Sequence, residues 1–296
     1  MARKLLLIVN PRSGTMRGQK QLLSVIQTFC EADFEVSVHT TRFPKDATEV
    51  VRTRGKGFDV ICALGGDGTL NEVVTGAISS GYSGAIGFLP CGTTNDLAST
   101  LSLPKKVEDS AKLVAEGQAE YLDFGAFNDD RYFSYIASFG AFTEVSYSTG
   151  QKAKNTFGHL AYVANGVGAV FQIKPYHVRV TCDGKVIEGD FVFGAAANSF
   201  SIAGMVKLQK DTVDLSDGLH ELALVKTPKS VAAFVNILHE IMRGRFSGEN
   251  VIFVKGKEIL FETDRPVSWC VDGEYAGDHS KVLIRNLHEK VRIFRP

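Results

Sequence analysis

Gly65-Gly66-Asp67-Gly68-Thr69-Leu70-Asn71-Glu72 stands where an apolar run, Phe58–Leu64, gives way to apolar residues at helical spacing. Three glycines in four residues let backbone N–H groups turn inward and approach a ligand closely. The helix that begins there adds the positive end of its dipole, which favours an anionic phosphate. The G-K-[ST] ending of a P-loop is missing, so the stretch predicts a phosphate-binding turn of another kind. The alternative is a tight strand–helix turn with an exposed Asp67.

The alternation of strand and helix extends outward from this turn, from residue 1 to about 120. Apolar runs at Leu5–Val9 and Ala85–Leu89 are typical of buried parallel strands, and Phe34–His39 alternates as a strand. Helices are predicted at residues 22–29, from Asp46 with a capping Glu49 through Arg54, from about Thr69, and at Val107–Glu116. We therefore expect residues 1–122 to form a three-layer α/β domain with a parallel sheet.

The pattern changes near residue 121. Tyr121–Phe127 and Arg131–Phe139 are strand-like around a turn at Asn128–Asp130, and Asp183-Gly184 is a hairpin signal. Further strands are predicted at Val178–Thr181, Val186–Phe193, Val251–Val254, Glu258–Phe261 and Lys281–Ile284, with helices at about Phe157–Phe171 and Ser230–Met242. Residues 123–289 are therefore expected to form an antiparallel β-sandwich with inserted helices, packed against the first domain across a cleft. Whether the last strand, near residues 290–296, rejoins the first domain is left open.

The composition excludes several classes of protein. The chain has 296 residues, and its 33 basic and 33 acidic residues cancel, so no overall basic field favours nucleic acid. No apolar run approaches the ~20 residues that span a bilayer, and Leu5–Val9 is too short for a secretory signal. We therefore expect a cytoplasmic protein. The five cysteines form no C-x-x-C pair and are interpreted as reduced thiols, and the seven scattered histidines predict no zinc site.

Two more polar loops follow predicted strands. Asn10-Pro11-Arg12-Ser13-Gly14 comes after the first strand, and Pro90-Cys91-Gly92-Thr93-Thr94-Asn95-Asp96 follows Ala85–Leu89. Parallel strands carry the loops at their carboxyl ends on one edge of the sheet, where open α/β sheets usually bind ligands. The alternatives are a plain turn for the first loop and an Asn95-Asp96 helix cap for the second. Two interpretations of Cys91 stay open: a redox switch, or a side chain that only fills space in the loop.

Together the three loops resemble the diacylglycerol kinase catalytic family, and the soluble bacterial lipid kinases in particular. The shared motifs are N-P-x-S-G, G-G-D-G-T-L-N-E-V and P-x-G-T-x-N-D. Asp214-Leu215-Ser216-Asp217-Gly218-Leu219 resembles the family's D-G-L magnesium segment, and Asp272-Gly273-Glu274 its D-G-E segment. The G-G-D-G element alone is shared with NAD kinases and phosphofructokinases, whereas the five motifs together are much more specific. Many members have an arginine where this chain has Ser99 or Thr100.

The resemblance implies a role for each motif. Glu274 is expected to be the general base, with Asp272 beside it and Asp67 as the other candidate for the base. Mg²⁺ is expected on Asp214, Asp217 and the carbonyl of Leu219, since it takes hard oxygen ligands. Without the resemblance, Asp217-Gly218 would be an ordinary turn and Asp272-Gly273 a hairpin. ATP is expected to contact Asn10, Pro11, Arg12, Ser13, Gly14, Thr41, Gly66, Asp67, Gly68, Thr69, Leu70, Asn71, Glu72 and Thr93.

These expectations describe an ATP-dependent lipid kinase that phosphorylates a hydroxyl of a membrane lipid such as diacylglycerol. It would work from the cytoplasm and dock transiently on the inner membrane surface without spanning it. A homodimer is left open. Two alternatives remain: a kinase for a soluble acceptor, similar to NAD kinases, and a nucleotide-binding regulatory protein with little turnover.

Overall fold

A computed structural model describes residues 2–14, 17–140, 175–199, 201–202, 206–207, 214–244, 246 and 248–296. The chain divides into two compact units. Unit 1 is Met1–Asp123 with His288–Pro296, and unit 2 is Phe124–Leu287. The helix predicted at Phe157–Phe171 lies outside the described residues.

Unit 1 contains a parallel sheet in the order β4-β3-β1-β2. Its strands are β1 (Arg3–Val9), β2 (Phe34–Thr40), β3 (Val60–Gly65) and β4 (Ala85–Pro90). The connecting helices are α1 (Arg17–Glu31), α2 (Asp46–Arg54), α3 (Asp67–Ser80), α4 (Asp96–Thr100) and α5 (Val107–Glu116), and a short 3₁₀ turn, η1 (Gly55–Gly57), follows α2. The strands and helices predicted for this half are confirmed, with ends shifted by a few residues.

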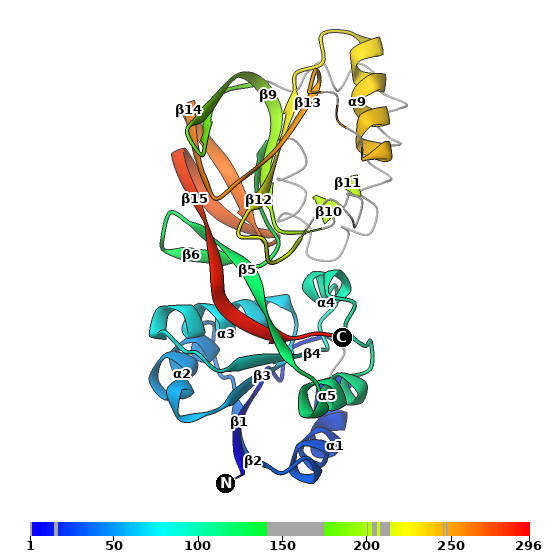
Figure 1. Ribbon diagram of the computed structural model, residues 1–296, viewed down its shortest axis with the longest axis vertical. Coiled ribbons are helices and arrows are strands. Elements are labelled where there is room, and N and C mark those ends of the chain that lie inside the picture. The colour runs from blue at the N-terminus through cyan, green and yellow to red at the C-terminus, as the bar shows by residue number, and fades with distance from the viewer. Residues whose placement is uncertain are drawn as a thin grey trace. The chain divides into compact units, whose positions relative to one another are not determined.

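Helices cover both faces of this sheet. Helices α1 and α5 lie together on one face, and α2 and α3 lie together on the other (Figure 1). Every residue of β3 and β4 is buried, as expected for central strands covered on both sides. The residues of β1 alternate between the two faces, so that Leu5 and Leu7 pack with Val25 and Phe29 of α1.

Unit 2 consists mainly of antiparallel strands. They run in the order β13-β12-β9-β7-β14-β15, and β8 pairs with both β9 and β14. The strands are β5 (Ala119–Phe127, which starts in unit 1), β6 (Arg131–Phe133), β7 (Ile136–Gly140), β8 (Tyr176–Cys182), β9 (Lys185–Ala197), β12 (His220–Lys226), β13 (Val251–Gly256), β14 (Glu258–Val271) and β15 (Glu274–Phe294). A small two-stranded sheet, β10 (Ser201–Ile202) with β11 (Val206–Lys207), and helix α9 (Val231–Arg243) complete the described part.

The core of unit 2 is aromatic. Trp269 is buried, and its ring lies 5.0 Å from that of Phe139, 5.1 Å from that of Phe261 and 5.4 Å from that of Phe127. The long strands β9 and β14 close around this core, because each pairs with β8 through one half and with β7 through the other.

Two Asp-Gly pairs in unit 2 form hairpins, the first of which was predicted from the sequence. Asp183 and Gly184 both have positive φ, 45° and 82°, and they join β8 to β9. Asp272 and Gly273, with φ of 47° and 83°, join β14 to β15 in the same way. Consecutive positive φ angles belong to the tight turn that matches the twist of a hairpin.

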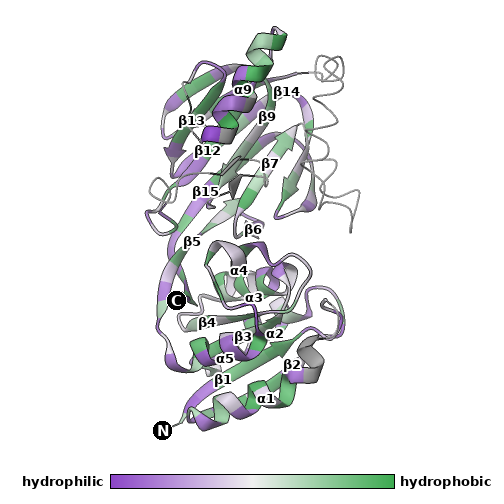
Figure 2. Cartoon of the chain, turned by 90° about the vertical axis from the view of Figure 1, so that its right-hand side faces the viewer, coloured by the Kyte–Doolittle hydropathy of each residue, from purple (hydrophilic) through white to green (hydrophobic). Residues whose placement is uncertain are grey.

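Helix α9, predicted at Ser230–Met242, begins after Ser230, whose side chain accepts a hydrogen bond from the Ala233 N–H. Hydrophobic and hydrophilic residues alternate along it in Figure 2, which is the pattern of an amphipathic helix. Among the described residues, no helix is both long and apolar enough to cross a bilayer.

The end of the chain belongs to unit 1. Arg292 and Ile293 of β15 pair in parallel with Ala85 and Ile86 of β4. His288, also in unit 1, places its Nδ1 2.9 Å from Oδ1 of the buried Asp123. Strand β15 therefore starts in unit 2 and supplies a strand to the parallel sheet.

One predicted strand is interrupted in the structure. Arg131–Phe139 was expected to be unbroken, but it is divided into β6 and β7 at Ser134 and Tyr135. The N–H groups of these two residues donate to the carboxylate of Asp272, far away in the sequence, and so are not free for a continuous ladder.

Candidate functional site

The three loops predicted to share one edge of the unit 1 sheet do meet there. The Asn10 N–H donates to the Leu64 carbonyl at 3.0 Å, and the Cys91 N–H donates to the Gly65 carbonyl at 2.8 Å. A Cβ on Gly14, which has a φ of 58°, would lie 2.0 Å from the Cys91 carbonyl oxygen. The loops therefore pack backbone against backbone, which only glycine permits at this position.

The loop at Asn10–Gly14 is tied to the first turn of α3. Asn10 donates through Nδ2 to the Thr69 hydroxyl at 2.9 Å, and its Oδ1 accepts the Arg12 N–H at 3.0 Å. Ser13 is buried beside Cys91. Burial raises the pKa of the Cys91 thiol, so this is not an activated thiolate.

The first turn of α3 is open above its glycine. A Cβ on Gly68 would meet no atom within 4 Å, and the N-cap position of the helix is Gly66, which has no side chain to cap it. The side chains of Thr69 and Leu70 are buried, and their N–H groups donate to the Gly66 carbonyl at 3.0 and 3.1 Å. An uncapped helix start with free space above it fits a phosphate group.

Asp67 has a partner that its motif does not reveal. Its carboxylate accepts the N–H groups of Asp96 and Leu97, at 3.0 and 3.3 Å, and so caps helix α4. Burial raises its pKa, although these backbone hydrogen bonds act in the opposite direction. Asn95 takes the N-cap position of α4, but its side chain instead closes the loop on the backbone of Gly92, with both hydrogen bonds at 3.0 Å.

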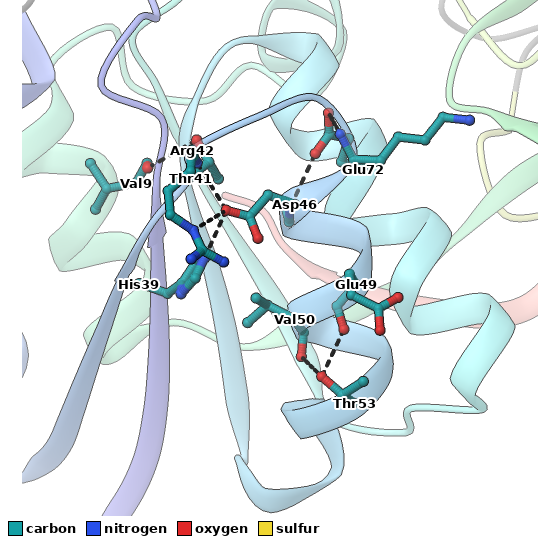
Figure 3. A network of polar contacts seen from close by, with 11 residues as sticks. Val9, His39, Thr41, Arg42, Asp46, Glu49, Val50, Thr53 and Glu72 are labelled. Carbon is teal, nitrogen blue, oxygen red and sulfur yellow. Dashed lines mark hydrogen bonds and ion pairs between the residues drawn. The ribbon is translucent and has the colours of Figure 1, made fainter.

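The capping box predicted from Asp46 and Glu49 is wrong. Helix α2 is capped from outside by Glu72, whose two carboxylate oxygens accept the N–H groups of Lys45 at 2.8 Å and Ala47 at 3.2 Å (Figure 3). Glu72 belongs to the glycine-rich motif, so α3 and α2 are connected through it.

Asp46 instead points back towards the loop after β2, as Figure 3 shows. Its Oδ2 accepts the Arg42 N–H at 2.8 Å and lies 3.3 Å from both Arg42 Nε and His39 Nε2. Burial acts to raise the pKa of Asp46, but the hydrogen bonds from Arg42 and His39 outweigh it and lower the pKa. Thr41, between these two residues, is held by its N–H donating to the Val9 carbonyl at 2.9 Å.

The remaining residues expected to contact a nucleotide are more accessible. Thr93 and Arg12 are exposed, and Pro11, Thr41 and Asn71 are half-buried. The described structure thus brings Asn10–Gly14, Gly66–Glu72 and Thr93 to one edge of the unit 1 sheet.

In unit 2, the D-G-E segment occupies the β14–β15 hairpin. The Asp272 carboxylate accepts four hydrogen bonds, from the Ser134 N–H (2.7 Å), the Ser134 hydroxyl (2.9 Å) and the N–H groups of Tyr135 and Ile136 (both 3.1 Å). Burial raises its pKa to about 6 against the effect of these donors. This carboxylate is an acceptor that holds the chain between β6 and β7.

Glu274, two residues later, has a different environment. Its side chain is 74% exposed, and its Oε2 lies 3.1 Å from Arg131 Nη2. Arg131 also donates from Nη1 to the Tyr275 carbonyl at 3.0 Å. A guanidinium that bonds both the side chain and the neighbouring backbone fixes the direction of the carboxylate. Arg131 is not predicted as a functional residue from the sequence, because it stands in a short strand outside every motif.

The D-x-x-D-G-L segment has an ammonium group beside it. Asp214 accepts the Ser216 N–H and Asp217 accepts the Leu219 N–H, both at 3.0 Å. The second oxygen of Asp217 lies 2.8 Å from Lys255 Nζ, which no motif had indicated. Among the residues that the structure describes, no three acidic, histidine or cysteine side chains form a group suited to a metal. As arranged, a divalent ion at Asp217 would meet the positive charge of Lys255, so the segment fits such an ion only after Lys255 moves away.

The comparisons with known proteins agree over both units. Residues 4–127 match the family of the diacylglycerol kinase catalytic domain, and residues 137–293 match the YegS C-terminal NAD kinase beta sandwich-like domain. A diacylglycerol kinase of Bacillus subtilis (strain 168) is 32% identical over 293 residues, which cover 98% of this chain and 95% of that protein. A diacylglycerol kinase of Staphylococcus aureus (strain MRSA252) is 32% identical over 298 residues, 100% of this chain and 93% of the relative. The crystal structure of a candidate diacylglycerol kinase from Bacillus anthracis str. Sterne, 25% identical, has a TM-score of 0.81 and covers 100% of this chain and 96% of its own. The chain belongs to the diacylglycerol kinase family.

Proposed function

We propose that this protein is an ATP-dependent lipid kinase, which transfers the γ-phosphoryl group of ATP to a hydroxyl of a lipid such as diacylglycerol. The observation that carries the proposal is the convergence of the loops after β1, β3 and β4, with an uncapped helix start and open space at Gly68. Family membership over both units supports a phosphoryl acceptor of the lipid class.

In unit 1, the backbone at the start of α3 holds the phosphates of ATP. Phosphoryl transfer depends on positioning and on charge stabilisation more than on covalent chemistry. The helix dipole at the start of α3 is already oriented, so it needs no reorganisation when the charge shifts. Asn10–Gly14, Thr41, Glu72 and Thr93 are proposed to complete the nucleotide site, directly or by holding its loops in place.

In unit 2, Glu274 is the proposed general base. A lipid hydroxyl is a weak nucleophile at neutral pH, so its proton must be accepted as the new P–O bond forms. Arg131 holds the Glu274 carboxylate in one direction. Asp272 fixes the hairpin that carries Glu274, which makes it a positioning residue with no direct contact to the acceptor.

Asp67 is the competing candidate for the base. Its bonds to the N–H groups of Asp96 and Leu97 favour a positioning role, because both of its oxygens are already engaged with α4. Glu274 is the more exposed of the two carboxylates and is therefore the better candidate.

The family uses ATP and usually a divalent metal, and we propose that the metal is Mg²⁺. Asp214, Asp217 and the Leu219 carbonyl remain a proposed binding site, which requires that Lys255 first leave Asp217. We also propose a three-layer arrangement for unit 1 and an antiparallel β-sandwich with inserted helices for unit 2. Helices on both faces of one sheet and antiparallel pairing in the other unit support these assignments.

The proposed partner is a lipid at the cytoplasmic surface of the inner membrane, and neither nucleic acid nor a membrane span is part of the proposal. The zero net charge supports the exclusion of nucleic acid. A homodimer stays open.

The direct test is incubation of the full chain with radiolabelled ATP and a total lipid extract, followed by chromatography of the labelled lipid. Diacylglycerol in mixed micelles and NAD in aqueous buffer are run in parallel. Labelled phosphatidic acid that requires the lipid supports the proposal. A labelled soluble product would favour a kinase like the NAD kinases, and ATP binding without any labelled product would favour a regulatory protein.

A further inference from the structure

Glu221 is a buried carboxylate that the proposed reaction does not use. It lies on β12, two residues after Leu219, and its side chain is 0% exposed. Neither of its oxygens receives a hydrogen bond of good geometry from the described residues. An ionised carboxylate in such a place is costly unless a cation lies close to it.

Lys255 is that cation. It stands directly opposite Glu221 in the β12–β13 ladder, and its Nζ lies 3.3 Å from Glu221 Oε1. The same ammonium group lies 2.8 Å from Oδ2 of Asp217. One lysine therefore lies between two carboxyl groups, one from the strand and one from the D-x-x-D-G-L segment.

This ion cluster is shielded from solvent. The side chains of Lys255 and Asp217 are 28% and 24% exposed, so water screens their charges less than at an open surface. The Lys255 ammonium donates to Asp217 and lies within ion-pair distance of Glu221, so both carboxylates hold it in place.

We propose that Lys255 is the resident cation of the D-x-x-D-G-L segment, and that a divalent ion binds at Asp217 only in competition with it. A divalent ion takes carboxylate oxygens at about 2.0–2.6 Å, so on Asp217 it would lie close to the Lys255 ammonium, and the two positive charges would repel each other. On metal binding, Lys255 would keep Glu221 as its partner. The inference deepens the proposed metal assignment and does not depend on the identity of the phosphoryl acceptor.

The test is a calorimetric titration of the full chain with Mn²⁺, without ATP or lipid. Lys255→Met should bind Mn²⁺ about tenfold more tightly than the parent, because a competing positive charge beside Asp217 is gone. Lys255→Arg keeps the charge and should bind as the parent does. Lys257→Met, at an exposed lysine two residues away, is the matched control and should also match the parent. Adding Asp217→Asn to Lys255→Met should abolish the gain.

Loss of Lys255 leaves Glu221 buried without a counter-charge, so the double variant Lys255→Met with Glu221→Gln is tested as well. It removes the ion pair as a unit and should show the same gain in affinity. Each variant is checked by circular dichroism and by thermal unfolding. Equal or weaker Mn²⁺ binding in a folded variant without Lys255 overturns the proposal, as does a gain that survives Asp217→Asn. Because no phosphoryl transfer is measured, failure here and failure of the kinase proposal are independent results.

Discussion

Replacing Asp272 distinguishes its role from that of Glu274, the other carboxylate of the D-G-E segment. Asp272→Ala removes the acceptor of three backbone N–H groups and one hydroxyl, from Ser134 to Ile136. Asp272→Asn keeps one acceptor oxygen, and its NH₂ group can donate to the Ser134 hydroxyl, so that only the Ser134 N–H loses its partner. Asparagine also tolerates the φ of 47° at this position, which alanine does not.

The expected magnitudes follow from these contacts. Three unpaired N–H groups cost about 2 kcal/mol each, and an alanine at positive φ adds about 1 kcal/mol. Removing a buried carboxylate whose pKa is raised to about 6 returns about 3 kcal/mol. The Ala variant should therefore lose about 4 kcal/mol of unfolding free energy, and the Asn variant should stay within about 1 kcal/mol of the parent. Glu274→Ala, which breaks only an exposed ion pair, should change the unfolding free energy by less than about 1 kcal/mol.

The assay is urea denaturation at pH 7, followed by tryptophan fluorescence. The chain has a single tryptophan, and Trp269 is buried in the core of unit 2 on the strand that leads into the hairpin. Its emission therefore reports the unfolding of the unit that contains Asp272. An Ala variant as stable as the parent would refute the anchoring role. Equal losses of unfolding free energy in the Ala and Asn variants would mean that stability depends on the charge of Asp272 and not on its acceptor atoms.

Four further outcomes are expected. Glu274→Gln should keep the ATP affinity but lower kcat by about 10²–10⁴, the range for a lost general base, and a parental kcat in steady-state assays would exclude Glu274. Arg131→Ala should lower kcat with the KM for ATP unchanged, and Arg131→Lys should restore part of it; no difference between these two variants would contradict a positioning role. Gly68→Val should block nucleotide binding by filling the open space above α3, and calorimetry that finds parental ATP affinity in the folded variant would disprove this. Because the pKa of Asp272 is raised in the folded state to about 6, its contribution to the unfolding free energy is present below pH 4 and is lost as the pH rises through 6. Relative to Asp272→Asn, the parent should lose about 3 kcal/mol of unfolding free energy over this range. If the unfolding free energies of the two proteins changed with pH in parallel, this prediction would be wrong.

Local patterns in the sequence determined the elements of the fold. The apolar run at Leu5–Val9 predicted a buried strand, and the helix at Val107–Glu116 was predicted with the ends that it has in the structure. Asp183-Gly184 predicted its hairpin because the positive φ angles of such a turn favour these residue types. Such signals need only neighbouring residues, so they can be read from one sequence.

The motifs also indicated which loops would meet, but not the partner of each side chain. That the three loops lie on one edge of the sheet follows from the parallel pairing of the strands alone. Asp67 was expected to contact ATP or to act as the base, yet in the structure its carboxylate caps α4. Glu72 was expected near the nucleotide, and it caps α2.

Only the tertiary structure decided the contacts between distant residues. Asp272 divides a strand 138 residues earlier in the chain, Arg131 reaches Glu274 across 143 residues, and Lys255 joins Asp217 across 38. Arg131 and Lys255 are ordinary surface residues by sequence, because they stand outside every motif and carry no periodic signal. The motifs singled out Asp217, Asp272 and Glu274 but not their partners. Those partners depend on which donor or charge the fold places beside each carboxylate, since an unpaired polar group in the interior must find a partner wherever the chain provides one.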